Sequence, residues 1–138
     1  MNKFLFLVPA ALLLATANAG TAAFKIIANA SVPAEAISAE DLRAVFLETK
    51  ALLDGIHPEP VLQRSGAVHE SFLKAYVGKS DSALENYYRS LVFTGKGSMP
   101  KYLGSDADVV AHVARTKGAI GYVNASASTP GVKTLEVK

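Results

Sequence analysis

The stretch VLQRSGAVHESF, residues 61–72, decides the fold because its residue pattern changes half-way along. It continues a short apolar run, PVLQ at residues 60–63, which is typical of a buried strand. Further on, apolar residues recur at every fourth position, at Val68, Phe72 and Tyr76. This second spacing predicts a helix. The residues Arg64, Ser65 and Gly66 are therefore expected at a turn that leads from a strand into a helix.

Such a turn has the chemistry of an anion site. A helix N-terminus carries unpaired backbone N–H groups and a partial positive charge, which together stabilise an anion placed there. Ser65 adds a hydroxyl, Gly66 permits close approach of the backbone, and Arg64 offers a fork that fits a tetrahedral oxyanion. A purely structural interpretation stays open, in which Ser65 is the N-cap of the helix and Arg64 a solvated surface charge.

Strand and helix patterns alternate along the rest of the chain. Strands are predicted at residues 24–33, 60–63, 119–123 and 132–137. Helices are predicted to begin near Ser38, Ser65, Ser80 and Ser105. Asp41 and Asp108 complete capping boxes with the first and last of these serines. The alternation predicts a single α/β domain, residues 20–138, with a mixed but mainly parallel sheet flanked by about four helices.

The N-terminus reads as a secretory signal peptide, residues 1–19. Lys3 is followed by the apolar run FLFLVPAALLLA and then by Ala17-Asn18-Ala19, a typical cleavage site. Cleavage after Ala19 would leave 119 of the 138 residues, enough for one domain with its own core. No second apolar run follows, so the exported chain is expected to be periplasmic and not to span a membrane.

Composition narrows the function further. The chain has no cysteine, which excludes disulfides and thiolate metal sites. Without Lys3 the formal charge falls from +2 to +1, and the basic residues are scattered along the chain. A nucleic-acid groove needs a basic stripe, so no nucleic-acid partner is expected.

A second candidate for anion contact is the glycine-rich segment TGKGS. It resembles a phosphate-cradling loop but is not a Walker motif, because Gly97 rather than Ser or Thr follows Lys96. The residues of this candidate loop are Thr94, Gly95, Lys96, Gly97 and Ser98. The simpler interpretation, a connection between two elements, stays open.

No catalytic or metal-binding motif is complete. His69-Glu70 begins like the zinc helix of metalloproteases, but Leu73 stands where the second histidine is required. The chain contains no G-x-S-x-G elbow, and its acidic residues form no spaced pair for acid–base catalysis. We therefore predict no catalytic residue, no metal, no cofactor and no enzymatic activity.

Several segments resemble one known family in their order along the chain. They are AEDLRAVFLETK at 39–50, VLQRSG at 61–66, SFLKAYVG at 71–78, LVFTGKGS at 91–98 and TKGAIGYV at 116–123. This order is similar to that in the second lobe of periplasmic phosphate-binding proteins, the receptors of phosphate ABC transporters. The resemblance implies a single lobe of the type II periplasmic-binding-protein fold.

The resemblance also implies which residues contact the anion. They are Arg64, Ser65, Gly66 and Ala67, with Ala67 standing where the family has a threonine. The expected function is a non-enzymatic module that binds phosphate or a similar oxyanion, linked to phosphate uptake, with a second chain or a transporter protein as partner. The alternative is a protein–protein interaction module of the cell envelope that keeps the fold without the ligand.

Overall fold

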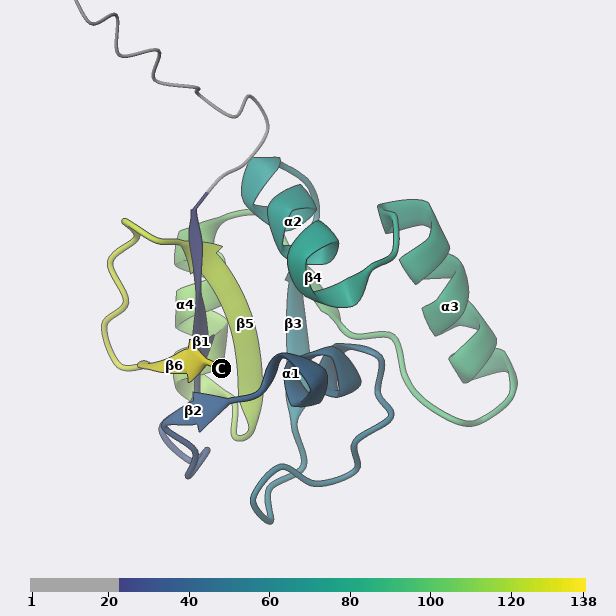
Figure 1. Cartoon of the computed structure of the whole chain (residues 1–138), viewed down its shortest axis with the longest axis horizontal. Coiled ribbons are helices and arrows are strands. Elements are labelled where there is room, and N and C mark those ends of the chain that lie inside the picture. Colours follow the sequence, from purple (N-terminus) through teal and green to yellow (C-terminus); the bar gives the residue numbers. More distant parts are fainter. Residues whose placement is uncertain (1–22) are drawn as a thin grey trace, which may run out of the picture.

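The computed structural model describes residues 23–138, and Figure 1 shows a twisted sheet with helices on both of its faces. The strands are β1 (Phe24–Ala28), β2 (Ala36–Ile37), β3 (Glu59–Gln63), β4 (Lys101–Leu103), β5 (Ala119–Asn124) and β6 (Lys133–Val137). The helices are α1 (Ala39–Phe46), α2 (Ala67–Phe72), α3 (Asp81–Phe93) and α4 (Asp106–Arg115). A π-helical segment, η1 (Leu73–Val77), extends α2. The predicted signal peptide lies outside the described residues.

The strands follow the order β2-β6-β1-β5-β3-β4. Three pairings within residues 23–138 are parallel, those of β2 with β6, β3 with β5 and β3 with β4. Strand β1 runs antiparallel to both of its neighbours, β5 and β6. The prediction of a mixed α/β sheet with four helices is confirmed, and its antiparallel part is centred on β1.

The two faces of the sheet bury separate clusters, because successive strand residues point to opposite sides. In β1, Ile26 and Ala28 join the cluster beneath α1 and α2, whereas Ile27 joins the cluster beneath α4. In β5, Tyr122 and Val123 divide in the same way. Both faces of the central strands are therefore covered, as the apolar run AIGYV predicts.

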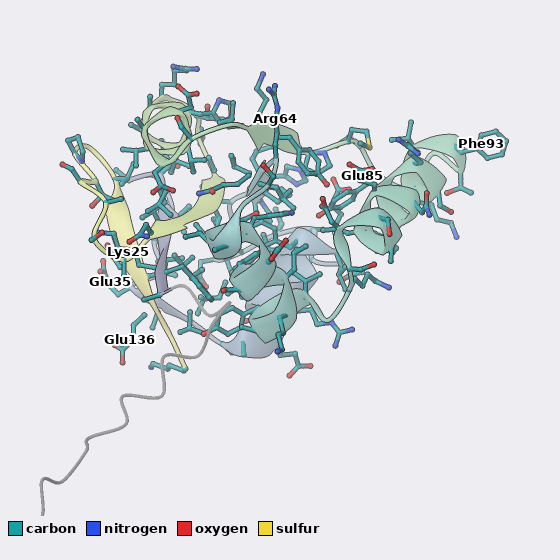
Figure 2. The ribbon with its side chains drawn as sticks, turned by 90° about the horizontal axis from the view of Figure 1, so that it is seen from above. Lys25, Glu35, Arg64, Glu85, Phe93 and Glu136 are labelled. Atoms are coloured by element: carbon teal, nitrogen blue, oxygen red, sulfur yellow. The ribbon has the colours of Figure 1, made fainter. Side chains whose placement is uncertain are left out.

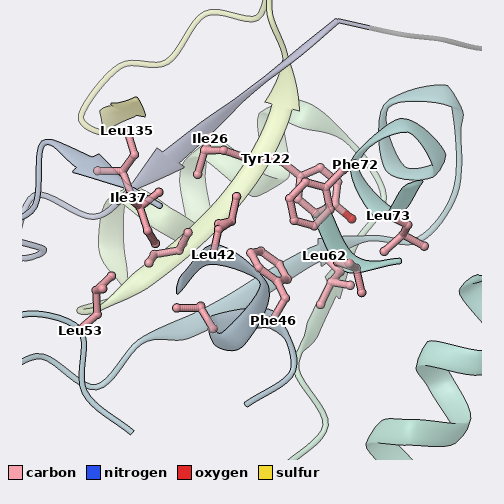
Figure 3. Packing of buried hydrophobic residues seen from close by; sticks show 14 of the residues in the cluster. Ile26, Ile37, Leu42, Phe46, Leu53, Leu62, Phe72, Leu73, Tyr122 and Leu135 are labelled. Carbon is pink, nitrogen blue, oxygen red and sulfur yellow. The ribbon is translucent and has the colours of Figure 1, made fainter. Parts of the chain in front are cut away.

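Aromatic rings fill the cluster on the α1 and α2 side (Figure 3). Phe72 of α2 stacks on Tyr122 of β5, with 3.9 Å between ring centroids. Phe46 of α1 meets Phe72 edge-on at 4.7 Å. The predicted helical stripe of Val68, Phe72 and Tyr76 is confirmed, since all three belong to this cluster or pack against it. These contacts fix α2, and with it the preceding turn, against the sheet.

Serine caps begin three of the four α-helices. Ser38 accepts the N–H of Asp41, Ser80 that of Ala83 and Ser105 that of Asp108. The predicted helix starts at these three serines are therefore confirmed. None of the helices in residues 23–138 has the length and apolar character needed to cross a membrane.

Two short strands were not predicted. β2 has two residues and β4 has three, too few to show an alternating pattern. β4 nevertheless pairs with β3 in register, with Leu62 opposite Tyr102. Because β3 and β4 are parallel, the start of α4, which follows β4, lies at the same end of the strands as the Arg64 turn.

Gly118 lies at the opposite end of the central strands, just before β5. Gly118 has φ of 78° and its carbonyl accepts the N–H of Glu59, joining the starts of β3 and β5. A Cβ at this position would lie 2.3 Å from the carbonyl oxygen of His57, which is part of the backbone and cannot rotate away. Glycine is required here by both conformation and space.

We expect Gly118→Ala to lower stability more than Gly55→Ala. Gly55 also has a positive φ, 83°, but a Cβ there meets nothing within 4 Å. Gly55→Ala should therefore cost only the backbone strain, about 1–2 kcal/mol, whereas Gly118→Ala adds displacement of the backbone. Urea unfolding of both variants measures the difference. Equal losses would show that the chain around His57 moves aside freely.

Candidate oxyanion-binding turn

The turn between β3 and α2 is open to solvent. Arg64, Ser65, Gly66 and Ala67 are all exposed, while the strand residues before them are buried. The backbone N–H of Arg64 donates to the carbonyl of Leu103 at 3.0 Å, which ties the turn to the end of β4. Its guanidinium pairs with no other residue of the described chain, and Figure 2 shows it at the surface. The predicted position of this turn, between a strand and a helix, is confirmed.

The N-cap of α2 is Gly66, not Ser65. Gly66 has φ of 108° and ψ of 171°, a conformation that is essentially restricted to glycine, and no side chain caps the helix. Its carbonyl accepts the N–H of Glu70 at 3.0 Å, so the helix begins at Ala67. The interpretation of Ser65 as a structural N-cap is therefore wrong. α2 alone among the four α-helices described begins without a serine cap.

A buried hydrogen-bond network fixes the position of the turn. The backbone N–H of Gln63, the residue before Arg64, donates to the hydroxyl of Tyr122 at 3.0 Å. The same hydroxyl contacts Nδ1 of His69 in α2. Burial raises the pKa of Tyr122, so its hydroxyl stays protonated. Because the oxygen already accepts from Gln63, we assign its O–H as the donor in the hydrogen bond with Nδ1 of His69. One oxygen thus connects β3, β5 and α2.

The network continues to the start of α3. Nε2 of His69 lies 2.9 Å from Oδ1 of Asp81. Since Nδ1 accepts from Tyr122, Nε2 carries the proton and donates it to the carboxylate. His69 is 1% exposed and both of its ring nitrogens are occupied by protein. No group of three metal-ligating side chains occurs among residues 23–138.

The side chain of Gln63 organises the same edge of the sheet. Its amide donates to Oδ1 of Asp106 at 2.7 Å and to the carbonyl of Tyr122 at 3.0 Å. Asp106 is the first residue of α4, and its Oδ1 also accepts the N–H of Asn124 at 3.4 Å. The carboxyl ends of β3 and β5 are therefore locked together beside the turn.

The glycine-rich segment at residues 94–98 has a different role. Its first four backbone N–H groups, those of Thr94, Gly95, Lys96 and Gly97, donate to carbonyls in the last turn of α3. These are the donors that a phosphate-cradling loop would need for its ligand. The segment is thus the C-terminal cap of α3, and its backbone has no free donor among these four positions.

The segment also lies at the other end of β3 from Arg64. Ser98 lines a cavity of about 330 Å³ with Glu59 and Pro60, the first residues of β3. Glu59 and Arg64 are five residues apart along β3, which corresponds to roughly 17 Å at about 3.3 Å per residue. One small anion cannot contact both places, so the structure does not bring the two predicted groups of site residues together.

At that far end, Glu48 holds the segment through a side-chain contact. The hydroxyl of Ser98 donates to Oε1 of Glu48 at 3.3 Å, and Oε2 is buried without a hydrogen bond. Burial raises the pKa of the Glu48 carboxyl, and the nearby charge of Glu59 raises it further. Glu48 itself has a left-handed backbone, with φ of 56°.

The sequence did not reveal the residues beneath the turn. Gln63, Tyr122, Asp81 and Asp106 come from four elements, and their contacts depend on the order of strands in the sheet. The one available signal was the tyrosine in the apolar run AIGYV. A buried tyrosine needs a hydrogen-bond partner for its hydroxyl.

Comparison with solved structures shows the fold. The chain is similar to an ABC-type phosphate transport receptor from Vibrio cholerae, with a TM-score of 0.66 and 13% identity over 84% of this chain and 46% of the receptor. It is also similar to a putative phosphate ABC transporter substrate-binding protein with bound phosphate from Clostridium perfringens. The TM-score is 0.66 and the identity 13%, over 84% of this chain and 45% of that protein. PstS from Borrelia burgdorferi matches with a TM-score of 0.65 and 12% identity, over 85% of this chain and 47% of PstS.

The chain has the fold of phosphate receptors. It spans slightly less than half of their length. No protein-family model matches the sequence, and no curated protein does so either. The resemblance seen in the sequence segments is confirmed at the level of the fold.

We expect Tyr122→Phe to destabilise the fold by about 1–3 kcal/mol, because it leaves the N–H of Gln63 and Nδ1 of His69 buried without a partner. Tyr76→Phe is the matched control, since no hydrogen bond of its hydroxyl occurs in the described chain. Urea midpoints of the two variants give the comparison. If both match the parent, the network does not hold the turn.

Glu48→Gln should stabilise the protein at neutral pH. A carboxyl with a raised pKa binds its proton more tightly in the folded state, so its contribution is present below its ordinary pKa of 4.5 and is lost as pH rises through the folded pKa. Glutamine keeps the contact with Ser98 without the charge. The urea midpoint should exceed that of the parent at pH 7 and approach it near pH 4. Glu136→Gln, at an exposed position, should show no such pH dependence.

Proposed function

We propose that this protein is a non-enzymatic, periplasmic binding module for phosphate or a similar tetrahedral oxyanion, and that it serves phosphate uptake. Arg64, Ser65, Gly66 and Ala67 form the site. The observation that carries the proposal is the bare start of α2, with an unpaired guanidinium beside it, on a fold similar to that of phosphate receptors. Those structural neighbours are receptors and substrate-binding proteins rather than enzymes.

The donors of the turn suit a tetrahedral anion. The first N–H groups of α2 have no intrahelical partner, and no side chain caps them. Gly66 has no Cβ, and an ideal Cβ there would have nothing within 4 Å, so a ligand can approach the backbone closely. Arg64 supplies a fixed positive charge with several N–H donors. Ala67 contributes its backbone N–H but no hydroxyl.

Two features limit the affinity of the turn in a lone chain. All four residues are exposed, so water competes with each contact and the charges act through a high dielectric constant. The carboxylate of Asp106 also lies at this edge, although Gln63 and Asn124 donate to it. We therefore infer weak binding by one chain, and tighter binding where a second chain or a transporter protein covers the turn.

The alternative, an interaction module that docks through the face beside Arg64, has less support. It requires exposed apolar side chains on that face. The large exposed apolar residues described are Leu52, Val92, Phe93 and Met99. They belong to the end of α3 or to the segments that precede β3 and β4, away from the turn.

Calorimetric titration with inorganic phosphate at low salt tests the proposal. The parent should bind saturably in the millimolar range, and Arg64→Ala should weaken binding by about tenfold or more, because a charge-assisted contact is lost. Lys96→Ala is the control, since it removes one positive charge from the segment that caps α3. Its affinity should equal that of the parent.

Sulfate titrations show how selective the turn is. Equal affinity for both anions is the expected result, because the N–H groups and Arg64 donate to any tetrahedral oxyanion. If Arg64→Ala and the parent give the same heats, or if Lys96→Ala loses binding instead, this site assignment is wrong.

A further inference from the structure

An apolar cavity lies where the chain passes from α2 through η1 into α3. Figure 1 shows the short connection that joins these helices. The cavity has a volume of about 490 Å³, which is within the usual range for small-molecule sites. Residues between 70 and 81 line it, and none of the turn residues 64–67 takes part. It is therefore a separate place on the molecule from the candidate oxyanion-binding turn.

The backbone beside the cavity is unusual. After Phe72 the α-helix widens into the π-helical turn η1, which closes with the N–H of Gly78 donating to the carbonyl of Leu73 at 2.8 Å. Gly78 has φ of 72°, and an ideal Cβ there would meet nothing within 4 Å. Turns of π-helix are rare and occur frequently at functional sites. A rare backbone conformation and a position without a side chain thus both border the cavity.

Four charged side chains line the cavity together with Leu73. Two are acidic, Glu70 and Asp81, and two are basic, Lys74 and Lys79. No ion pair within residues 23–138 joins any of the four to another. Leu73 is 3% exposed and contributes apolar surface. The cavity therefore combines apolar contact area with charges of both signs that do not neutralise one another in the fold.

Neighbouring rings hold one of the acids and one of the bases in place. Oδ1 of Asp81 accepts the N–H of His69 at 2.9 Å, yet the side chain of Asp81 remains 46% exposed. The ammonium of Lys79 lies 5.5 Å from the centroid of the Tyr87 ring, a cation–π contact. Because Lys79 and Asp81 are only two residues apart, opposite charges stand near each other at the start of α3. A ligand that contacts both needs two charges of its own that are close together.

We propose that this cavity binds an apolar α-amino acid in its zwitterionic form. The carboxylate of the ligand contacts Lys74 and Lys79, its ammonium contacts Glu70 and Asp81, and its side chain packs on Leu73. A ligand with a single charge would meet like charges as well as opposite ones, so the balanced lining selects against it. The volume leaves room for an aromatic side chain.

Amide NMR spectra of the full chain, titrated with L-phenylalanine in phosphate-free buffer, test the proposal. We expect saturable shift changes at Gly78, Lys79 and Ser80, with millimolar affinity because water competes at exposed charges. Glu70→Gln and Lys74→Met should each weaken binding by about fivefold, since each removes one charged contact and keeps most of the side chain. Both positions are exposed, so the fold does not depend on either charge.

Glu136→Gln and Lys96→Met are the matched controls, because they make the same changes of charge at exposed positions outside the cavity. Both should bind L-phenylalanine as the parent does. Hydrocinnamate and phenethylamine each lack one charge of the amino acid and should bind at least about fivefold more weakly.

Three results would overturn the proposal. One is the absence of saturable shift changes around the cavity in the parent. Another is unchanged affinity in both Glu70→Gln and Lys74→Met. The third is binding of hydrocinnamate or phenethylamine as tight as that of L-phenylalanine, which would show that the cavity does not recognise a zwitterion.

Discussion

The hydroxyl of Tyr122 accepts the N–H of Gln63 and donates to His69, and the position of the Arg64 turn depends on this buried oxygen. The contact joins β3, β5 and α2 beneath a turn that has no packing of its own. Phe72 of α2 stacks on the ring of the same tyrosine, so both the hydroxyl and the ring of Tyr122 hold α2 against the sheet. An exposed turn binds a ligand better when buried contacts fix its backbone, because ordering flexible donors on binding costs free energy.

Polar contacts also fix α3, which stands apart from the sheet. At its start, Asp81 accepts a hydrogen bond from His69. Along its length, the hydroxyls of Tyr87 and Tyr88 donate to the carbonyls of Leu47 and Phe46, the last of α1. These tyrosines satisfy backbone groups that the end of α1 leaves unpaired. These hydrogen bonds attach the helix to α1 and α2 although much of its surface is exposed.

Much of the fold could be predicted from sequence because the signals were local. Ser38 and Ser105 begin helices through contacts three residues away, and Val68, Phe72 and Tyr76 follow the helical period. The place of the Arg64 turn followed from the same patterns. The antiparallel pairing of β1 was not predicted in detail, because strand order arises from contacts between segments far apart in the chain.

The candidate site was predictable only in part for the same reason. The residues of the turn were found because they adjoin one another, whereas Gln63, Tyr122 and Asp106 meet through the sheet. The segment at residues 94–98 has the composition of a phosphate loop. Composition does not show that its N–H groups already donate to α3 carbonyls.

Hydrogen bonds connect the first turn of α3 with the Arg64 turn. Asp81 borders the apolar cavity and also ends the hydrogen-bonded chain that runs through His69 and Tyr122 to the N–H of Gln63. A contact that restrains Asp81 therefore restrains the backbone immediately before Arg64. Ordering the turn in advance lowers the entropy cost of binding an anion there.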